Sequence, residues 1–210
     1  LDRVTIGLEY EVAYSAEGLE ARSIDFATFG PRGTPIADAT LRAIMPLTDR
    51  SVMESLSLRG IANLEPLGRQ PIFAGLPTAR EGTISWALDS TFGDASSVTA
   101  SANLKGALTD DLGPLPDVEA GLDLQAVSEQ RLAVRAPLKL TSEVGVSDAL
   151  FVGEAVREDD RLRVDASLAG DRIVTSDVRR FLELLHHRRG DGQTAEDTPA
   201  AAAPDRPSRT

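Results

Sequence analysis

The chain has 210 residues and a formal net charge of −11, with 33 acidic residues against 22 basic ones. Nucleic-acid binding needs clustered Lys and Arg, so this balance argues against a nucleic-acid partner and against electrostatic attraction to anionic lipid headgroups. Cysteine is absent, which excludes disulfides, thiolate nucleophiles and cysteine-based metal sites. Because only 41% of the residues are hydrophobic and 4% aromatic, we expect a thin core of Ala, Val and Leu.

The chain begins at Leu1 rather than Met and enters a strand pattern almost at once. We therefore expect it to be a piece of a longer protein. No apolar run approaches the roughly 18 residues that a membrane span requires, and no signal-peptide pattern is present. Any membrane anchor or export signal is expected outside this piece.

Strict alternation of apolar and polar residues, which is typical of β-strands with one apolar face, begins near residue 4. Residues 4–14 predict a first strand, and a return strand starts at Leu19. In that second strand Leu19 and Ala21 occupy one phase, whereas Ile24 and Phe26 occupy the other. A phase change of one residue predicts a β-bulge, which would bend the sheet.

The segment 35–81 has a less regular pattern. Ala37–Met45 predicts a short helix, because Ala, Leu, Arg and Met favour one, and Pro46 would end it. Leu56 and Leu58 predict a strand that bends at Gly60. Residues 61–68 predict a short helical turn ending at Gly68.

From Gly82 the sequence predicts a meander of strands near 83–92, 97–108, 117–127, 131–141, 148–156 and 161–169. Gly, Pro and Asp residues in the intervening segments favour tight turns. Pro137 lies inside one of these strands and has no N–H for a ladder hydrogen bond. We therefore expect that strand to be bulged or to lie at an edge of the sheet.

One helix follows, from Ser176 as N-cap to the basic pair Arg188 and Arg189, and Gly190 ends it. Residues 190–210 are rich in Ala and Pro without an apolar pattern, which predicts a disordered linker or tail. We expect one elongated β-rich domain over 1–189, with 1–81 and 82–189 as an alternative division into sub-repeats.

The sequence offers few candidates for chemistry. His186 and His187 are adjacent on a helix and point about 100° apart, so they do not suit one metal site, and no nucleophile-elbow motif accompanies them. Residues 190–195 match a loose dinucleotide fingerprint but lack the strand before it and the helix after it. The acidic groups at 110–111 and 158–160 lie in predicted turns. We expect no catalytic residue, metal site or cofactor, and a protein that is not an enzyme.

The apolar stripes of the meander are the candidate site. They have two interpretations: the interior of a closed β-sandwich, or the lining of an open, curled trough that holds acyl chains. A β-fold hydrolase is a third, which would require clustered carboxylates on an exposed face. Trp86 suits core packing or ligand contact in the groove. The predicted groove residues are Ile84, Trp86, Leu88, Val98, Leu104, Val118, Leu122, Leu124, Leu132, Val134, Leu138, Leu140, Leu162 and Val164.

Two parts of the sequence resemble AsmA-like bacterial envelope proteins. The first comprises SLSLRGIANLEPLG at 55–68, EGTISW at 81–86 and ANLKGAL at 102–108; the second is LAGDRIVTSDVRRFLELL at 168–185. The second resembles the closing strand, short capped helix and following Ala/Pro-rich linker of that family, although Arg179 and Arg180 replace its usual acidic or apolar residues. The resemblance implies a mostly β, elongated and curled antiparallel meander, an open trough of the β-taco kind.

The family's function, as implied by the resemblance, is non-enzymatic. It implies a periplasmic segment of a protein anchored in the inner membrane, acting in intermembrane lipid transport or outer-membrane assembly. The expected partners are phospholipid or another acyl-chain lipid and other envelope proteins. The alternative is a structural or interaction module built as a closed β-sandwich in a cell-surface protein.

Overall fold

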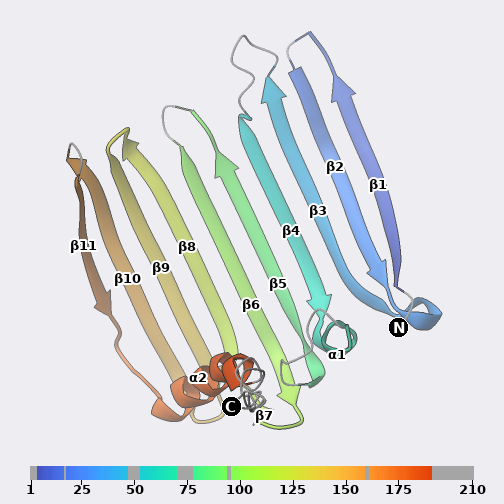
Figure 1. Ribbon diagram of the computed structural model, residues 1–210, viewed down its shortest axis with the longest axis vertical. Coiled ribbons are helices and arrows are strands. Elements are labelled where there is room, and N and C mark those ends of the chain that lie inside the picture. The colour runs from blue at the N-terminus through green and yellow to red at the C-terminus, as the bar shows by residue number, and fades with distance from the viewer. Residues whose placement is uncertain are drawn as a thin grey trace, which may run out of the picture.

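The computed structural model describes residues 4–16, 18–46, 53–70, 78–93, 96–158 and 161–190, and over these the chain forms a single antiparallel sheet (Figure 1). Eleven strands belong to it, ten of them in the order β1-β2-β3-β4-β5-β6-β8-β9-β10-β11, with β7 paired to β6. The strands are β1 (Thr5–Tyr14), β2 (Gly18–Phe29), β3 (Pro35–Pro46), β4 (Ser55–Asn63), β5 (Ala79–Thr91), β6 (Ser97–Thr109), β7 (Gly113–Pro114), β8 (Asp117–Ser128), β9 (Arg131–Ser142), β10 (Gly145–Glu158) and β11 (Arg161–Ala169).

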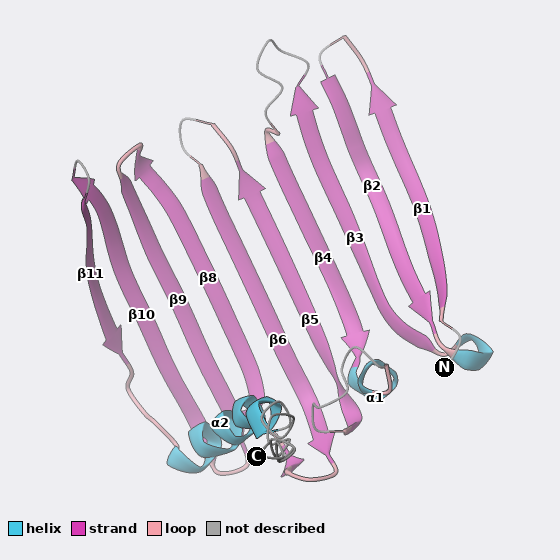
Figure 2. Cartoon of the chain, viewed as in Figure 1, coloured by secondary structure: helices cyan, strands magenta, loops and turns pink. Residues whose placement is uncertain are grey.

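The helical segments are η1 (Pro31–Gly33), α1 (Leu64–Gly68) and α2 (Thr175–Gly190), and all lie at one end of the sheet (Figure 2). In Figure 1 the central strands are seen face-on and β11 nearly edge-on, so the sheet curls at that edge. The predicted fold class, an open and curled antiparallel meander with a short C-terminal helix, is confirmed. The sandwich alternative is wrong, because the described residues contain no second sheet.

The predicted bulge in the second strand is confirmed. The register of β1 with β2 shifts between Glu11 and Val12, and that of β2 with β3 shifts between Ala21 and Ile24. The extra residue in β2 brings both apolar phases of the strand onto one face, since Ala21 pairs with Ala43 and Ile24 with Leu41. The bulge therefore keeps the apolar face continuous.

The helix predicted at Ala37–Met45 is wrong, because these residues form β3. Their apolar side chains also alternate with period two, and β2 and β4 supply hydrogen-bonding partners on both sides. Helix propensity amounts to a fraction of a kcal/mol per residue, so pairing along two edges outweighs it.

Strand β4 continues through Gly60 instead of bending there. The indole of Trp86 lies over this glycine: a Cβ built on Gly60 would be 2.4 Å from Trp86 Cζ2. Glycine is thus required by the aromatic ring beside it, and the strand runs on to Asn63. The predicted helical turn follows as α1: it begins at Leu64 and not at residue 61, because residues 61–63 belong to β4, and it ends at Gly68 as expected.

The edge position or bulge predicted for Pro137 is also wrong, since β9 lies between β8 and β10 inside the sheet. The register is the same on both sides of the proline, with Ala120 opposite Leu138 and Asp123 opposite Arg135. Gly121 makes room for the ring: a Cβ there would lie 2.9 Å from Pro137 Cγ. A glycine on the neighbouring strand therefore lets an interior strand accommodate proline.

Helix α2 is present, but its predicted N-cap is not, because the helix begins at Thr175. The first turn is held instead by the end of the sheet. Val174 N–H donates to Ser147 Oγ at 2.7 Å, and Ser142 Oγ donates to Asp177 Oδ2 at 2.8 Å. The predicted tail beyond Gly190 lies outside the described residues, as do residues 159 and 160 of the acidic turn.

The buried core is small and lies at the end that carries the helices. Near α1 the buried apolar side chains are Ile36, Ala62 and Ala107, and near α2 they are Val118, Leu140 and Val174. Gly82 has φ 117° and brings β5 close to Ala107 and to Leu64 of α1. The rest of the sheet is a single layer.

Candidate functional site

The strand register places all fourteen predicted groove residues on one face of the sheet. A row of direct cross-strand partners runs Ile84, Leu104, Val118 and Leu140 over β5, β6, β8 and β9. Other rows contain Val98, Leu124 and Val134, and Leu162 and Val164 follow on β11 through their pairing with β10. We call this side of the sheet the apolar face.

The apolar face extends beyond the predicted residues, across the first four strands. The row through Ile84 continues to Ala62, Ala37, Thr28 and Ile6. The alternation at 4–14 already indicated an apolar stripe, but the expected helix at 37–45 interrupted it. The residues missed are Ile6, Leu8, Tyr10, Val12 and Tyr14 of β1, Leu19, Ala21, Ile24 and Phe26 of β2, Ala37, Ala39, Leu41, Ala43 and Met45 of β3, and Leu56, Leu58 and Ala62 of β4.

The chemistry of the apolar face is uniform over its middle. From β3 to β9 the paired residues on this side carry no charge, and their hydroxyls are few: Ser90 pairs with Leu56 and Val98, and Ser142 pairs with Gly145 at the capped end. Trp86 lies on this face between Gly60 and Ala102. A surface with almost no hydrogen-bonding side chain matches a partner that also has none.

Most of the apolar face is uncovered by the described chain. At the β1 edge Ile6 is 70% exposed and Tyr10 73%, and at the β11 edge Leu168 is 74% exposed. In the middle, Leu122, Leu124 and Val134 are half-buried by their neighbours in the same sheet. Contiguous exposed apolar surface is uncommon on soluble monomers and is typical of interaction surfaces, which makes the apolar face the candidate site.

One end of the apolar face is closed by the segment that leads into α2 (Figure 1). There Leu140 is 3% exposed, and Ser147 and Asp177 are buried polar partners of that segment. Arg180 Nη1 donates to the carbonyl of Pro114 at 3.1 Å, which ties the helix to the turn region beside β7. The apolar face is therefore capped at this end and open along the rest of the strands.

The opposite face is more polar, although Ile44, Ile61 and Val152 also lie on it, and ion pairs join its strands. Arg59 Nη2 lies 3.5 Å from Asp89 Oδ2, and Arg131 pairs with Glu154 across β9 and β10. At the other edge the hydrogen bond from Arg22 to Glu11, followed by that to Glu20, raises the pKa of the Arg22 guanidinium. Apart from the half-buried Glu154 these side chains are exposed, and exposed pairs usually stabilise a fold by less than about 1 kcal/mol each.

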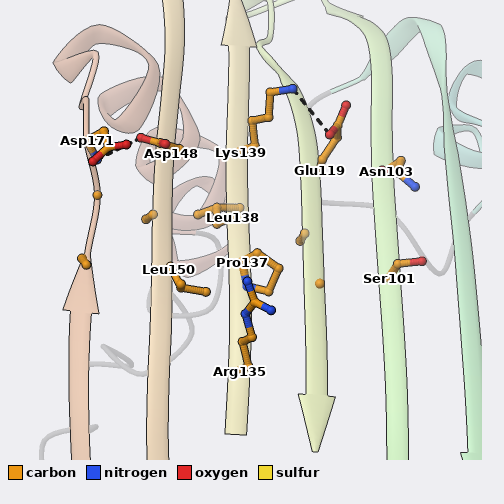
Figure 3. Close-up of a pocket in the computed structure, with 15 residues that line it drawn as sticks. Ser101, Asn103, Glu119, Arg135, Pro137, Leu138, Lys139, Asp148, Leu150 and Asp171 are labelled. Carbon is orange, nitrogen blue, oxygen red and sulfur yellow. Dashed lines mark hydrogen bonds and ion pairs between the residues drawn. The ribbon is translucent and has the colours of Figure 1, made fainter.

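A hollow of about 610 Å³ lies on the polar face, over β6, β8, β9 and β10 (Figure 3). Arg135 and Lys139 line it together with Asp148 and Asp171. The carboxylate of Asp148 accepts hydrogen bonds from the backbone N–H groups of Asp171 and Arg172, both at 3.1 Å. Apolar side chains such as Pro137 and Leu150 also line it, so the hollow is chemically mixed, in contrast to the apolar face.

Within the described part of the chain, the remaining sequence candidates form no second site. The side chains of His186 and His187 lie outside the described part of α2, and so does most of the 190–195 motif. Asp110 pairs with Arg80 at the turn after β6. The described residues hold no group of three or more His, Asp and Glu side chains suited to a metal ion.

Comparisons with known proteins yield no family model, no curated protein and no solved structure that matches this chain. The resemblance to AsmA-like proteins therefore stays a prediction. Within the described residues, none of the helices has the length and apolar character needed to cross a bilayer.

Proposed function

We propose that this chain is a non-enzymatic lipid-handling segment of an AsmA-like bacterial envelope protein, and that acyl chains lie on its apolar face. The observation that carries the proposal is the extent of that face: it crosses ten strands, and within the described residues a helix covers it at one end only. The proposed role is intermembrane lipid transport or outer-membrane assembly.

The chemistry of the face favours acyl chains over a protein partner. Protein interfaces carry about one hydrogen bond per 100–200 Å². The paired side chains from β3 to β9 offer few hydroxyls: that of Ser90 is buried, and that of Ser142 already donates to Asp177. A hydrocarbon chain needs no polar partner, and the many Ala and Leu side chains suit it along its whole length.

The dimensions of the sheet also support the proposal. Strands spaced about 4.8 Å apart make a path of ten strands roughly 43 Å wide, and a strand of ten residues is about 33 Å long. An extended phospholipid tail therefore fits on the face whether it lies across the strands or along them. Burying half of a ~14-carbon chain contributes about 5 kcal/mol, which holds a lipid without trapping it, as transport requires.

The proposed location is the periplasm, in a full-length protein anchored in the inner membrane. Its support is the resemblance of 55–108 and 168–185, which also makes other envelope proteins the proposed partners. The net charge of −11 favours capture of lipid through its tails over capture through anionic headgroups.

The test is mass spectrometry of organic extracts from the chain purified after periplasmic expression. We expect stoichiometric phospholipid from the wild type. Leu122→Asp places a carboxylate in the middle of the apolar face, and we expect it to reduce the bound phospholipid at least about fivefold while the β-sheet circular dichroism spectrum is retained.

The matched control is Gln125→Asp, on the same strand but on the polar face, where the side chain is exposed. It adds the same charge and should leave the bound phospholipid unchanged. A lipid-free extract from well-folded wild-type protein contradicts the proposal, and so does an equal loss of lipid in both variants.

A further inference from the structure

The two outer strands of the sheet differ from the interior ones in having a pairing partner on one side only among the described residues. Strand β1 is ten residues long, TIGLEYEVAY, and contains neither Pro nor Lys. Natural proteins protect such edges with prolines, lysines, bulges or a covering segment, because an open edge is a template for another strand. Among the described residues no proline, lysine or covering segment protects the β1 edge, and the bulge beside it lies in β2.

The polar sides of the two edges carry opposite net charges. Strand β1 presents Glu9 and Glu11, and Glu11 accepts a hydrogen bond from Arg22. Strand β11 presents Arg161 and Arg163 together with Asp165, which lies 3.0 Å from Arg163. Glu9 lies directly opposite Asp25 of β2, and like charges in that position are destabilising. Among the described residues Glu9 has no ion pair or hydrogen bond of its side chain, so a cation on the open side would relieve this repulsion.

We propose that β1 of one copy of this chain pairs antiparallel with β11 of a second copy, with Glu9 opposite Arg163 and Glu11 opposite Arg161. Strand direction allows it. Neighbours on the ten-strand path are antiparallel throughout, so β1 and β11, at its two ends, run in opposite directions. A second copy shifted sideways thus brings its β11 antiparallel to β1, with both apolar faces on the same side.

The same register matches the apolar residues. With Glu9 opposite Arg163, Leu8 faces Val164 and Tyr10 faces Leu162, and these are among the most exposed apolar side chains of the molecule. A shift of two residues in one direction places Glu9 opposite Asp165, and a shift in the other leaves Glu11 beyond the start of β11. Of these three registers, only the proposed one places both Glu9 and Glu11 opposite an arginine.

The contact joins two different surfaces, so it is heterologous and can repeat from copy to copy. Repetition would lengthen the sheet and continue the apolar face across the junction. Pairing of β1 with β1 would bring glutamates together and is disfavoured. The proposal is independent of acyl binding, because the edges can associate whether or not the face holds lipid.

Two charge variants test the proposal. Glu9→Arg with Glu11→Arg makes both edges basic, and Arg161→Glu with Arg163→Glu makes both edges acidic. In analytical ultracentrifugation we expect the wild type to form dimers and larger species as concentration rises. Each variant alone should associate at least about tenfold more weakly.

Mixing the two variants should restore association, because each basic edge then meets an acidic one. The control is Glu129→Arg with Glu143→Arg, two exposed turn residues far from both edges in sequence, which changes the net charge by the same amount as the first variant. It should associate like the wild type. A monomeric wild type at all concentrations, or charge variants that associate like the wild type, would overturn the proposal.

Disulfide trapping tests the register, since the chain has no cysteine of its own. Antiparallel partners lie close enough for a disulfide, so a mixture of Leu8→Cys and Val164→Cys proteins should give the mixed dimer under mild oxidation. Crosslinks found only within the Val164→Cys protein would show symmetric β11 pairing and overturn the proposal, as would crosslinks found only within the Leu8→Cys protein.

Discussion

The end of the apolar face that α2 covers and its open middle are built from the same alternating pattern but differ in what lies over them. Leu140 and Val118 are buried beneath the segment leading into α2, whereas Leu122 and Val134, on the same two strands, are only half-buried. Both pairs lie on one face. The same two strands, β8 and β9, thus carry a capped end and an open part of the apolar face.

The comparison shows that period-two alternation specifies a face and not its cover. Over the capped end, polar groups anchor the covering segment: Ser147 accepts from the Val174 N–H, and Asp177 accepts from Ser142. No serine or threonine occurs among the residues of the middle of the face between β6 and β9, so nothing there offers such an anchor. The distribution of a few hydroxyl groups separates core from candidate site.

The first prediction, with the greatest expected loss of stability, concerns Leu140 at the capped end of the apolar face. Leu140→Asp buries an unpaired carboxylate and should lower the free energy of unfolding by about 3 to 5 kcal/mol. Leu122→Asp introduces the same group where water reaches it, and should cost about 1 kcal/mol or less. Urea unfolding followed by circular dichroism measures both. Equal losses would mean that the middle of the face is as enclosed as the capped end.

The second prediction concerns Gly60, where the indole of Trp86 covers the backbone. A Cβ on Gly60 would meet Trp86 Cε2 at 2.6 Å and Asp38 O at 2.8 Å. Gly60→Ala should therefore cost about 2 kcal/mol and move the ring, shifting the fluorescence of the single tryptophan. Gly7→Ala, whose Cβ meets nothing closer than 3.8 Å, is the matched control and should leave the emission unchanged. An unshifted emission in Gly60→Ala would refute the close contact.

The third prediction, with the least expected loss of stability, concerns the hydrogen bond between Ser142 and Asp177 that holds the start of α2. Asp177→Ala removes the acceptor of the Ser142 hydroxyl and should cost about 1.5 kcal/mol. Ser142→Ala removes the donor, and the double variant should cost clearly less than the sum of the single changes, because both affect one hydrogen bond. Thermal unfolding of the three proteins measures the coupling. Additive losses would mean that the two side chains stabilise the fold separately.

The fold could be predicted from the sequence wherever alternation was clean. The strands from Gly82 onward, the bulge after Ala21 and the end of α1 at Gly68 follow from period, phase and a single glycine. The errors share a cause. Ala37–Met45 has good helix formers, Gly60 is a strand breaker and Pro137 disfavours an interior strand, and in each case a neighbouring strand decided otherwise.

Which side chains share a face follows from the sequence, because successive residues of a strand point to opposite sides of the sheet, and all fourteen predicted groove residues lie together. That this face is open within the described residues, that it extends to β1, and that its two edges have opposite net charge could be seen only in the folded chain. Those properties depend on strand order, register and the position of α2, which are set by contacts between residues far apart in the chain.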